Sequence, residues 1–169
     1  MAGKKLHCLF GIKDDLHEFA EAAINTLPLC AMNAPLTWCQ DFGSVQAGIL
    51  HRDDNFQIEL IVVQPNVWIP EHVHPGTDTI EYPISGHVRF VINGQALFDG
   101  YDDDRFLSFS KGKGVRINQG DVHAGQTLPM GAMFLSIQRW DTKQPDHIGN
   151  NWVGAGVSDT HHKIIEGLR

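Results

Sequence analysis

The chain has 169 residues, of which 42% are hydrophobic and 20% charged, a composition that fits one globular domain and excludes a disordered or collagen-like protein. Its 13 basic and 20 acidic residues give a net charge of −7, and no block of Lys or Arg is longer than Lys4-Lys5, so we expect neither nucleic acid nor a membrane as a partner. The 3 cysteines form no Cys-x-x-Cys pair and indicate neither a disulfide framework nor a cysteine zinc site, so we expect a cytoplasmic location. The 10 histidines make imidazole the commonest side chain for binding a metal or transferring a proton near neutral pH.

A helix is predicted near the N-terminus. Asp15-Leu16-His17-Glu18 has the pattern of a capping box, after which apolar residues recur at helical spacing until Pro28. The apolar stripe comprises Leu16, Phe19, Ala20, Ala23, Ile24 and Leu27. Such a stripe predicts that the helix packs against another part of the chain.

From about residue 36 the hydrophobic period changes to two, and short apolar runs alternate with turn residues. Asn93-Gly94 suits a two-residue hairpin turn with positive φ, so we expect antiparallel neighbours. This pattern is typical of an all-β sandwich or barrel. The predicted strands are 36–40, 44–51, 56–64, 67–74, 80–92, 95–98, 106–109, 115–118 and 132–140.

The segment after residue 140 is less regular, and its end, 159–168, is compatible with a short terminal helix. We expect a helical extension over residues 1–35, a barrel over 36–140 and a C-terminal extension over 141–169 that packs on the barrel. Because exposed sheet faces and edges are commonly covered by a second subunit, we also expect a homodimer.

Two histidines on one predicted strand carry the strongest chemical signal. His72 and His74 are two residues apart, so both side chains point to one face, where two imidazoles can bind one cation. The same spacing alone also fits two polar residues on a solvated face. A third histidine, His123, lies in the segment 118–125, and a carboxylate follows His74 within the next turn. Three imidazoles and one carboxylate would suit Fe(II), Mn(II), Ni(II), Co(II) or Zn(II) and leave one or two positions for water or substrate.

These residues resemble the first of two motifs of the cupin superfamily. That motif is written Gly, five residues, His-x-His, three or four residues, Glu, six residues, Gly. His72 and His74 occupy its histidine positions, and Gly86 occupies its last glycine position. Asn66 replaces the first glycine, and asparagine also tolerates the left-handed backbone conformation.

The second cupin motif is written Gly, five residues, Pro-x-Gly, two residues, His, three residues, Asn. Gly112, Gly120 and His123 occupy its positions in register. Asn118 replaces the proline, and Thr127 replaces the final asparagine. Two motifs in order along the chain are a stronger signal than either motif alone.

The carboxylate ligand departs from the cupin pattern. The family glutamate is expected three or four residues after the second histidine, at Asp78 or Thr79, whereas the glutamate of this chain is Glu81. Glu81 shares strand parity with Thr79 and is displaced by about 6.6 Å along a regular strand. One extra residue in the turn 75–78 would absorb much of that displacement. We therefore predict Glu81 as the fourth ligand, with Asp78 as the alternative.

Three further polar residues are candidates for a substrate pocket. Gln138 and Arg139 point to opposite faces of the last predicted barrel strand, so one of them, or neither, orients a substrate. Glu59 lies in an otherwise apolar strand, where its carboxyl group either lines the pocket or faces outward. The sequence identifies no catalytic residue.

The resemblance covers about residues 44–140 and implies a jelly-roll (cupin) β-barrel that holds a divalent transition metal, with Fe(II) favoured. We expect a metal-dependent enzyme that acts on a small organic substrate, most concretely an Fe(II) oxygenase in which substrate and O₂ bind at the three-histidine, one-carboxylate site. The alternatives are a redox-neutral isomerase or lyase and a non-catalytic small-molecule-binding cupin. The fold alone does not choose among them.

Overall fold

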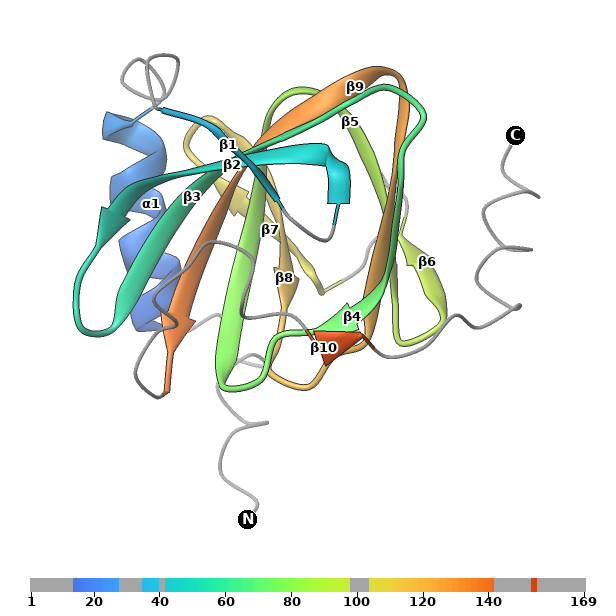
Figure 1. Cartoon of the computed structure of the whole chain (residues 1–169). Helices are drawn as coiled ribbons and strands as arrows, with labels where there is room; N and C mark the ends of the chain where they lie inside the picture. The colour runs from blue at the N-terminus through green and yellow to red at the C-terminus, as the bar shows by residue number, and fades with distance from the viewer. Residues whose placement is uncertain (1–13, 28–34, 40–41, 98–103, 142–152, 155–169) are drawn as a thin grey trace.

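A computed structural model describes residues 14–27, 35–39, 42–97, 104–141 and 153–154 of the chain. Within these residues one helix, α1 (Asp15–Thr26), precedes the strands (Figure 1). None of the helical structure described here has the length and apolarity that a membrane crossing requires. The helix predicted at 159–168 lies outside the described residues.

The strands are β1 (Thr37–Cys39), β2 (Phe42–Arg52), β3 (Phe56–Val63), β4 (Trp68–Val73), β5 (Thr77–Ile92), β6 (Gln95–Leu97), β7 (Phe106–Phe109), β8 (Gly112–Ile117), β9 (His123–Trp140) and β10 (Val153–Gly154).

The two longest strands, β5 and β9, run side by side through the barrel and belong to both of its faces. They pair antiparallel along most of their length, from Thr77↔Trp140 to Ile92↔His123. One face has the strand order β1-β2-β3-β9-β5-β8-β7. On the other face, β4 pairs with β9, β6 pairs with β5, and β10 adds to β4. Figure 1 shows these strands curling around a common interior, so the predicted all-β barrel with an N-terminal helix is confirmed.

Strand β9 begins at His123, nine residues before the predicted start at residue 132. The strand is longer than predicted because it continues through a bend, where the sequence pattern is interrupted. Residues 128–131 of this bend have no partner on β5 in the register of the two strands. Pro129, which lacks an amide hydrogen, lies in the bend, and Gly131 adopts a φ of 68°. The backbones meet closely here, since a Cβ on Gly86 would lie 2.1 Å from the carbonyl oxygen of Gly131.

Two asparagines adopt the left-handed backbone conformation that the sequence predicts for them. Asn93, with a φ of 50°, and Gly94, with a φ of 79°, form the turn between β5 and β6. Asn66, with a φ of 57°, precedes β4 at the first glycine position of the cupin motif. The hairpin prediction is therefore confirmed, and Asn66 fills the role of a glycine at its position.

Helix α1 begins one residue earlier than the capping box suggests. The cap is Asp14, whose side chain accepts a hydrogen bond of 2.9 Å from the His17 amide, whereas Asp15 is already helical. Asp14 can act as the cap because its backbone is extended, with a ψ of 172°. The predicted cap at Asp15 is thus wrong by one position, although the predicted helix is correct.

The apolar stripe of α1 covers the outer face of β3, β5 and β9. Because successive strand residues point to opposite faces, the residues between these outward ones point into the barrel. The same three strands are therefore buried under the helix on one face and line a cavity with the other. The shared core comprises Leu16, Ala20, Ala23, Ile24, Ile58, Leu60, Ile80, Tyr82, Leu135 and Ile137.

Candidate metal centre

Three histidines meet inside the barrel. His72 near the end of β4 and His123 at the start of β9 are direct cross-strand partners, and His74 follows β4 on the same side as His72. Each offers one ring nitrogen, and these nitrogens all lie within 4.8 Å of one another. The ring centroids are 4.1 Å apart for His72 and His123, and 4.9 and 5.0 Å apart for the pairs that include His74. The structure thus brings together the three histidines that the sequence singles out.

Two of the imidazoles are oriented by backbone carbonyl groups. The Nδ1 atom of His72 lies 2.8 Å from the carbonyl oxygen of Pro70, and Nδ1 of His123 lies 3.1 Å from that of Asp121. When Nδ1 carries the proton and donates it to the carbonyl oxygen, Nε2 keeps its lone pair for a metal. Both contacts join residues two apart in the chain, so the same local backbone geometry serves both ligands.

Burial keeps these imidazoles neutral at pH 7. It lowers the pKa of His72 to about 3, with a further contribution from the neighbouring His123. Burial, followed by the two neighbouring imidazoles, holds the pKa of His74 well below its ordinary value, and burial also lowers the pKa of His123. Metal binding requires the neutral form of histidine, so the cluster is prepared to bind a cation without first losing protons.

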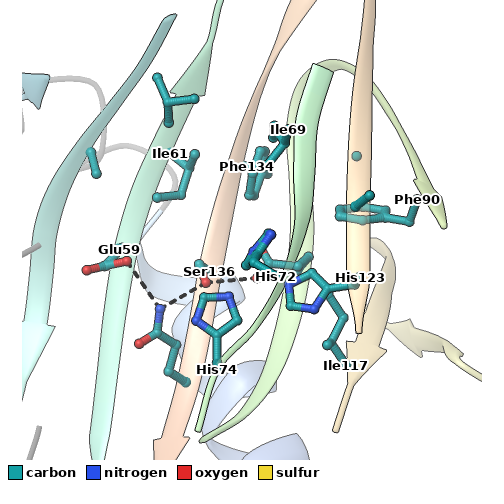
Figure 2. A pocket seen from close by; sticks show the side chains of 16 residues that line it. Glu59, Ile61, Ile69, His72, His74, Phe90, Ile117, His123, Phe134 and Ser136 are labelled. Carbon is teal, nitrogen blue, oxygen red and sulfur yellow. Dashed lines mark hydrogen bonds between the residues drawn. The ribbon is translucent and has the colours of Figure 1, made fainter. Parts of the chain in front are cut away.

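The histidines line a cavity with a volume of about 60 Å³. Figure 2 shows the three imidazoles together at one end, with Ile61, Ile69 and Phe134 above them. Two carboxyl groups, Glu59 and Glu81, line the same cavity, together with Ser136 and Gln138. The cavity therefore joins a polar floor to apolar walls, as small-molecule sites commonly do. The walls are formed by Val45, Ala47, Ile61, Ile69, Phe90 and Phe134.

Similar solved structures identify the fold. The polyketide cyclase RemF from Streptomyces resistomycificus is 15% identical to this chain, with a TM-score of 0.55 over 80% of this chain and 89% of its own. The cupin domain of Cnp3 from Schizosaccharomyces pombe is 8% identical, with a TM-score of 0.52 over 65% of this chain and 71% of its own. The chain has the cupin fold. The DMSP lyase DddQ from Ruegeria pomeroyi is also similar, at 22% identity and a TM-score of 0.50 over 73% of this chain and 66% of its own. A scan against protein-family models and a search of curated proteins found no match.

The cupin motif positions carry the backbone conformations that explain their residue types. Asn66, Gly86 and Gly120 all have positive φ, at 57°, 71° and 81°. Asn66 precedes β4, Gly120 precedes β9, and Gly86 lies at a register irregularity within β5. The Oγ of Thr127, which replaces the last asparagine, donates a hydrogen bond of 2.7 Å to the Gln64 carbonyl oxygen and accepts one of 2.9 Å from the Val67 amide. Thr127 therefore connects β9 to the loop that precedes β4 through two hydrogen bonds.

Glu81 lies beside the histidine cluster but does not belong to the group of atoms within 4.8 Å. Its Oε1 accepts a hydrogen bond of 2.9 Å from the Ser136 hydroxyl. Its Oε2 is buried and has no hydrogen-bond partner among the described residues, which is costly unless a ligand completes it. Burial raises the pKa of this carboxyl group to about 8. A cation at the histidines would satisfy Oε2 and favour the ionised form, so the role of Glu81 as fourth ligand stays a prediction that this geometry supports.

Asp78 and Arg139 occupy the outer side of the barrel instead. The Asp78 carboxyl pairs with Arg139, lies 3.7 Å from Arg116 and accepts a hydrogen bond of 2.8 Å from the Gln119 amide. Arg139 also pairs with Asp15 at the start of α1. Asp78, the alternative ligand, and Arg139, a candidate pocket residue, therefore lie away from the cavity. Both belong to a group of ion pairs that connects the barrel to the start of α1.

Gln138 and Glu59 both line the cavity and belong to one hydrogen-bond network. The Gln138 Nε2 atom donates to Glu59 Oε2 at 3.2 Å and to Ser136 Oγ at 3.1 Å. Gln57, which the sequence does not single out, donates to Glu59 Oε1 at 2.8 Å. The available signal for Gln57 is its position two residues before Glu59 on the same strand face. The two candidates that share the inner face are thus connected to Glu81 through Ser136.

Proposed function

We propose that this chain is a metal-dependent enzyme that acts on a small organic substrate inside the barrel. One observation carries the proposal, namely that His72, His74 and His123 converge within 4.8 Å on a buried cavity. The donor set fits a divalent transition metal, because three neutral imidazoles supply nitrogen lone pairs and Oε2 of Glu81, which has no partner in the described part of the chain, supplies an adjacent oxygen. Such a set suits Fe(II), Mn(II), Ni(II), Co(II) or Zn(II).

The chain's own residues have separable tasks in this proposal. The three histidines and Glu81 would hold the ion, which when bound supplies a Lewis acid and, as Fe(II), a source of electrons for O₂. Ser136 fixes one oxygen of Glu81 and so orients the other. The apolar walls, which include Ile61 and Phe134, exclude water from the space in which a substrate would lie.

The reaction class that we propose is Fe(II)-dependent oxygenation, since a three-histidine, one-carboxylate site leaves positions for both substrate and O₂. A redox-neutral isomerase or lyase is the second candidate, and one observation favours it. The cavity contains a further buried carboxyl group, Glu59, whose pKa burial raises to about 7, as suits a group that accepts and returns a proton near neutral pH. O₂ consumption with Fe(II) supports the first candidate, whereas turnover without O₂ in the Zn(II) or Mn(II) protein supports the second.

Metal analysis of the purified protein tests the shared part of both candidates. We expect about one equivalent of a divalent metal per chain in the wild type and its loss in His74→Ala. His51→Ala is the matched control, because His51 is an exposed histidine that pairs with Asp53 at 2.9 Å outside the cavity. Equal metal content in wild type and His74→Ala would contradict the proposal.

We also propose that the protein acts as a homodimer. The edge strand β1 carries Trp38, whose side chain is large and apolar and is 49% exposed, so a second copy would cover it favourably. Size-exclusion chromatography with light scattering tests this proposal. A monomeric mass at micromolar concentration would contradict it.

A further inference from the structure

Glu59 lies across the cavity from the predicted metal ligands, in one cross-strand row with Ser136 and Glu81. The register pairs Glu59 with Ser136 between β3 and β9, and Ser136 with Glu81 between β9 and β5. Because neighbouring strands are about 4.8 Å apart, the backbones of the two glutamates are separated by about 10 Å. Figure 2 shows Ser136 between Glu59 and the histidine cluster. The Glu59 carboxyl group and the histidines therefore line the same cavity from different sides.

The Glu59 carboxyl group is held in place by two amide donors. Gln57 donates to Oε1 at 2.8 Å, and Gln138 donates to Oε2 at 3.2 Å. The two glutamines are themselves fixed, because the side-chain oxygen of Gln57 accepts from Arg52 and that of Gln138 accepts from Trp140 at 3.2 Å. Each glutamine thus turns its N–H groups toward Glu59. The two donors fix the carboxyl group in one orientation, and its oxygens keep further lone pairs. Burial favours the neutral form of this group when no cation is beside it, and a cation in the cavity would shift it to the carboxylate.

This carboxylate has no cationic partner of its own among the described residues. Arg52 is the one positive charge that lowers the pKa of Glu59, and its Nε donates to Gln57 rather than to the carboxylate. Glu59 is only 5% exposed. A buried carboxylate that is oriented by neutral donors and has no paired cation is completed electrostatically by a positively charged ligand.

We propose that Glu59 recognises a positively charged amino group of the substrate. The inference rests on the proposed metal function, because it places the other end of the substrate at the histidines. The substrate class is then a short molecule with a metal-binding oxygen group at one end and an ammonium group at the other. The cavity of about 60 Å³ has room for about four to six non-hydrogen atoms, at about 10–15 Å³ each. Ile61 and Phe134 would contact the carbon atoms between the two ends.

Two small molecules of the same shape test this proposal. β-Alanine carries an ammonium group where butyrate carries a methyl group, and both carry a carboxylate for the metal. Isothermal titration calorimetry on the Zn(II)-loaded protein should show that the wild type binds β-alanine about 10- to 100-fold more tightly than butyrate. Glu59→Gln removes the negative charge with little change of shape, so it should abolish this preference and leave the affinity for butyrate within about threefold.

Two further variants keep the test decisive. Glu59→Asp retains the charge on a shorter side chain and should keep a reduced preference for β-alanine. Glu71→Gln is the matched control, since Glu71 is also buried but does not line the cavity, and it should keep the full preference. Thermal unfolding establishes that each variant is folded, and metal analysis establishes that each is loaded.

The outcomes separate this inference from the proposed function. If the wild type retains no Zn(II), the metal function itself fails, and the inference fails with it. If Zn(II) is retained but the wild type binds β-alanine no more tightly than butyrate, or binds neither, the recognition role of Glu59 is overturned and the metal site stands. The same conclusion holds if folded Glu59→Gln shows the full wild-type preference, or if folded Glu59→Asp shows none.

Discussion

Replacing Glu59 with glutamine should make the stability of the metal-free protein less dependent on pH. Burial raises the pKa of the Glu59 carboxyl group from 4.5 to about 7, so the folded protein retains a proton that the unfolded chain has already released. The stability that the neutral group contributes is fully present below pH 4.5 and is lost as the pH rises through about 7. At about 1.4 kcal/mol per pH unit, the difference amounts to about 3 kcal/mol in total, most of which is lost between pH 5 and pH 8.

Urea unfolding of chelator-treated wild type and Glu59→Gln at pH 5 and pH 8 measures this effect. The titrating groups that do not interact with Glu59, including the three histidines, are present in both proteins and cancel in the difference. Glu81 cancels only in part, because the Glu59 charge contributes to its raised pKa. Relative to wild type, Glu59→Gln should gain about 2–3 kcal/mol of unfolding free energy between pH 5 and pH 8. Asp54→Asn, at an exposed turn position, is the control and should show no comparable gain. A gain below about 0.5 kcal/mol, or a loss, would refute the reasoning that burial holds a proton on Glu59.

Three further predictions test other parts of the structure. Asp14→Ala removes the cap of α1 and should lower the unfolding free energy by about 1 kcal/mol in urea titrations, and an unchanged midpoint would contradict the assigned cap. Glu81→Gln should weaken metal binding at least about tenfold in chelator competition. Asp78→Asn should instead lower the melting temperature and leave metal affinity unchanged. Full metal affinity in Glu81→Gln would remove Glu81 from the ligand set. Gly86→Ala places a Cβ 2.1 Å from a backbone oxygen at a position of positive φ and should lower the unfolding free energy by more than about 3 kcal/mol. Gly120→Ala, with open space around its Cβ, should lower it by only about 1 kcal/mol. Equal losses would contradict the close approach at Gly86.

The histidine cluster could be predicted because short-range spacing determines side-chain direction. His72 and His74 are two residues apart on an extended segment, so their common face follows from strand geometry alone. The prediction of His123 depended on the second cupin motif. The residues around His123 do not themselves indicate that it lies opposite His72 on the neighbouring strand. The backbone carbonyl groups that orient these rings could not be predicted. Their positions depend on the backbone conformation just before each histidine, and the sequence pattern does not specify that conformation.

The rest of the cavity depends on register between distant strands. Gln57 and Gln138 are hydrogen-bonded although 81 positions separate them, and that pairing exists only because β3 lies beside β9. Strand parity leaves Gln138 and Arg139 as alternatives for the inner face, because either face of a strand can be the buried one. The helix resolves this choice, since it places the acidic Asp15 over the outer face, where Arg139 pairs with it.

Anomalous diffraction from crystals of the Zn(II)-loaded protein tests the central claim most directly. We expect one strong zinc peak per chain inside the barrel, with His72, His74 and His123 each contributing a nitrogen at about 2.0–2.1 Å and Glu81 an oxygen at about 2.0–2.2 Å. A peak that contacts fewer than two of these histidines, or zinc bound only at surface sites, would contradict it.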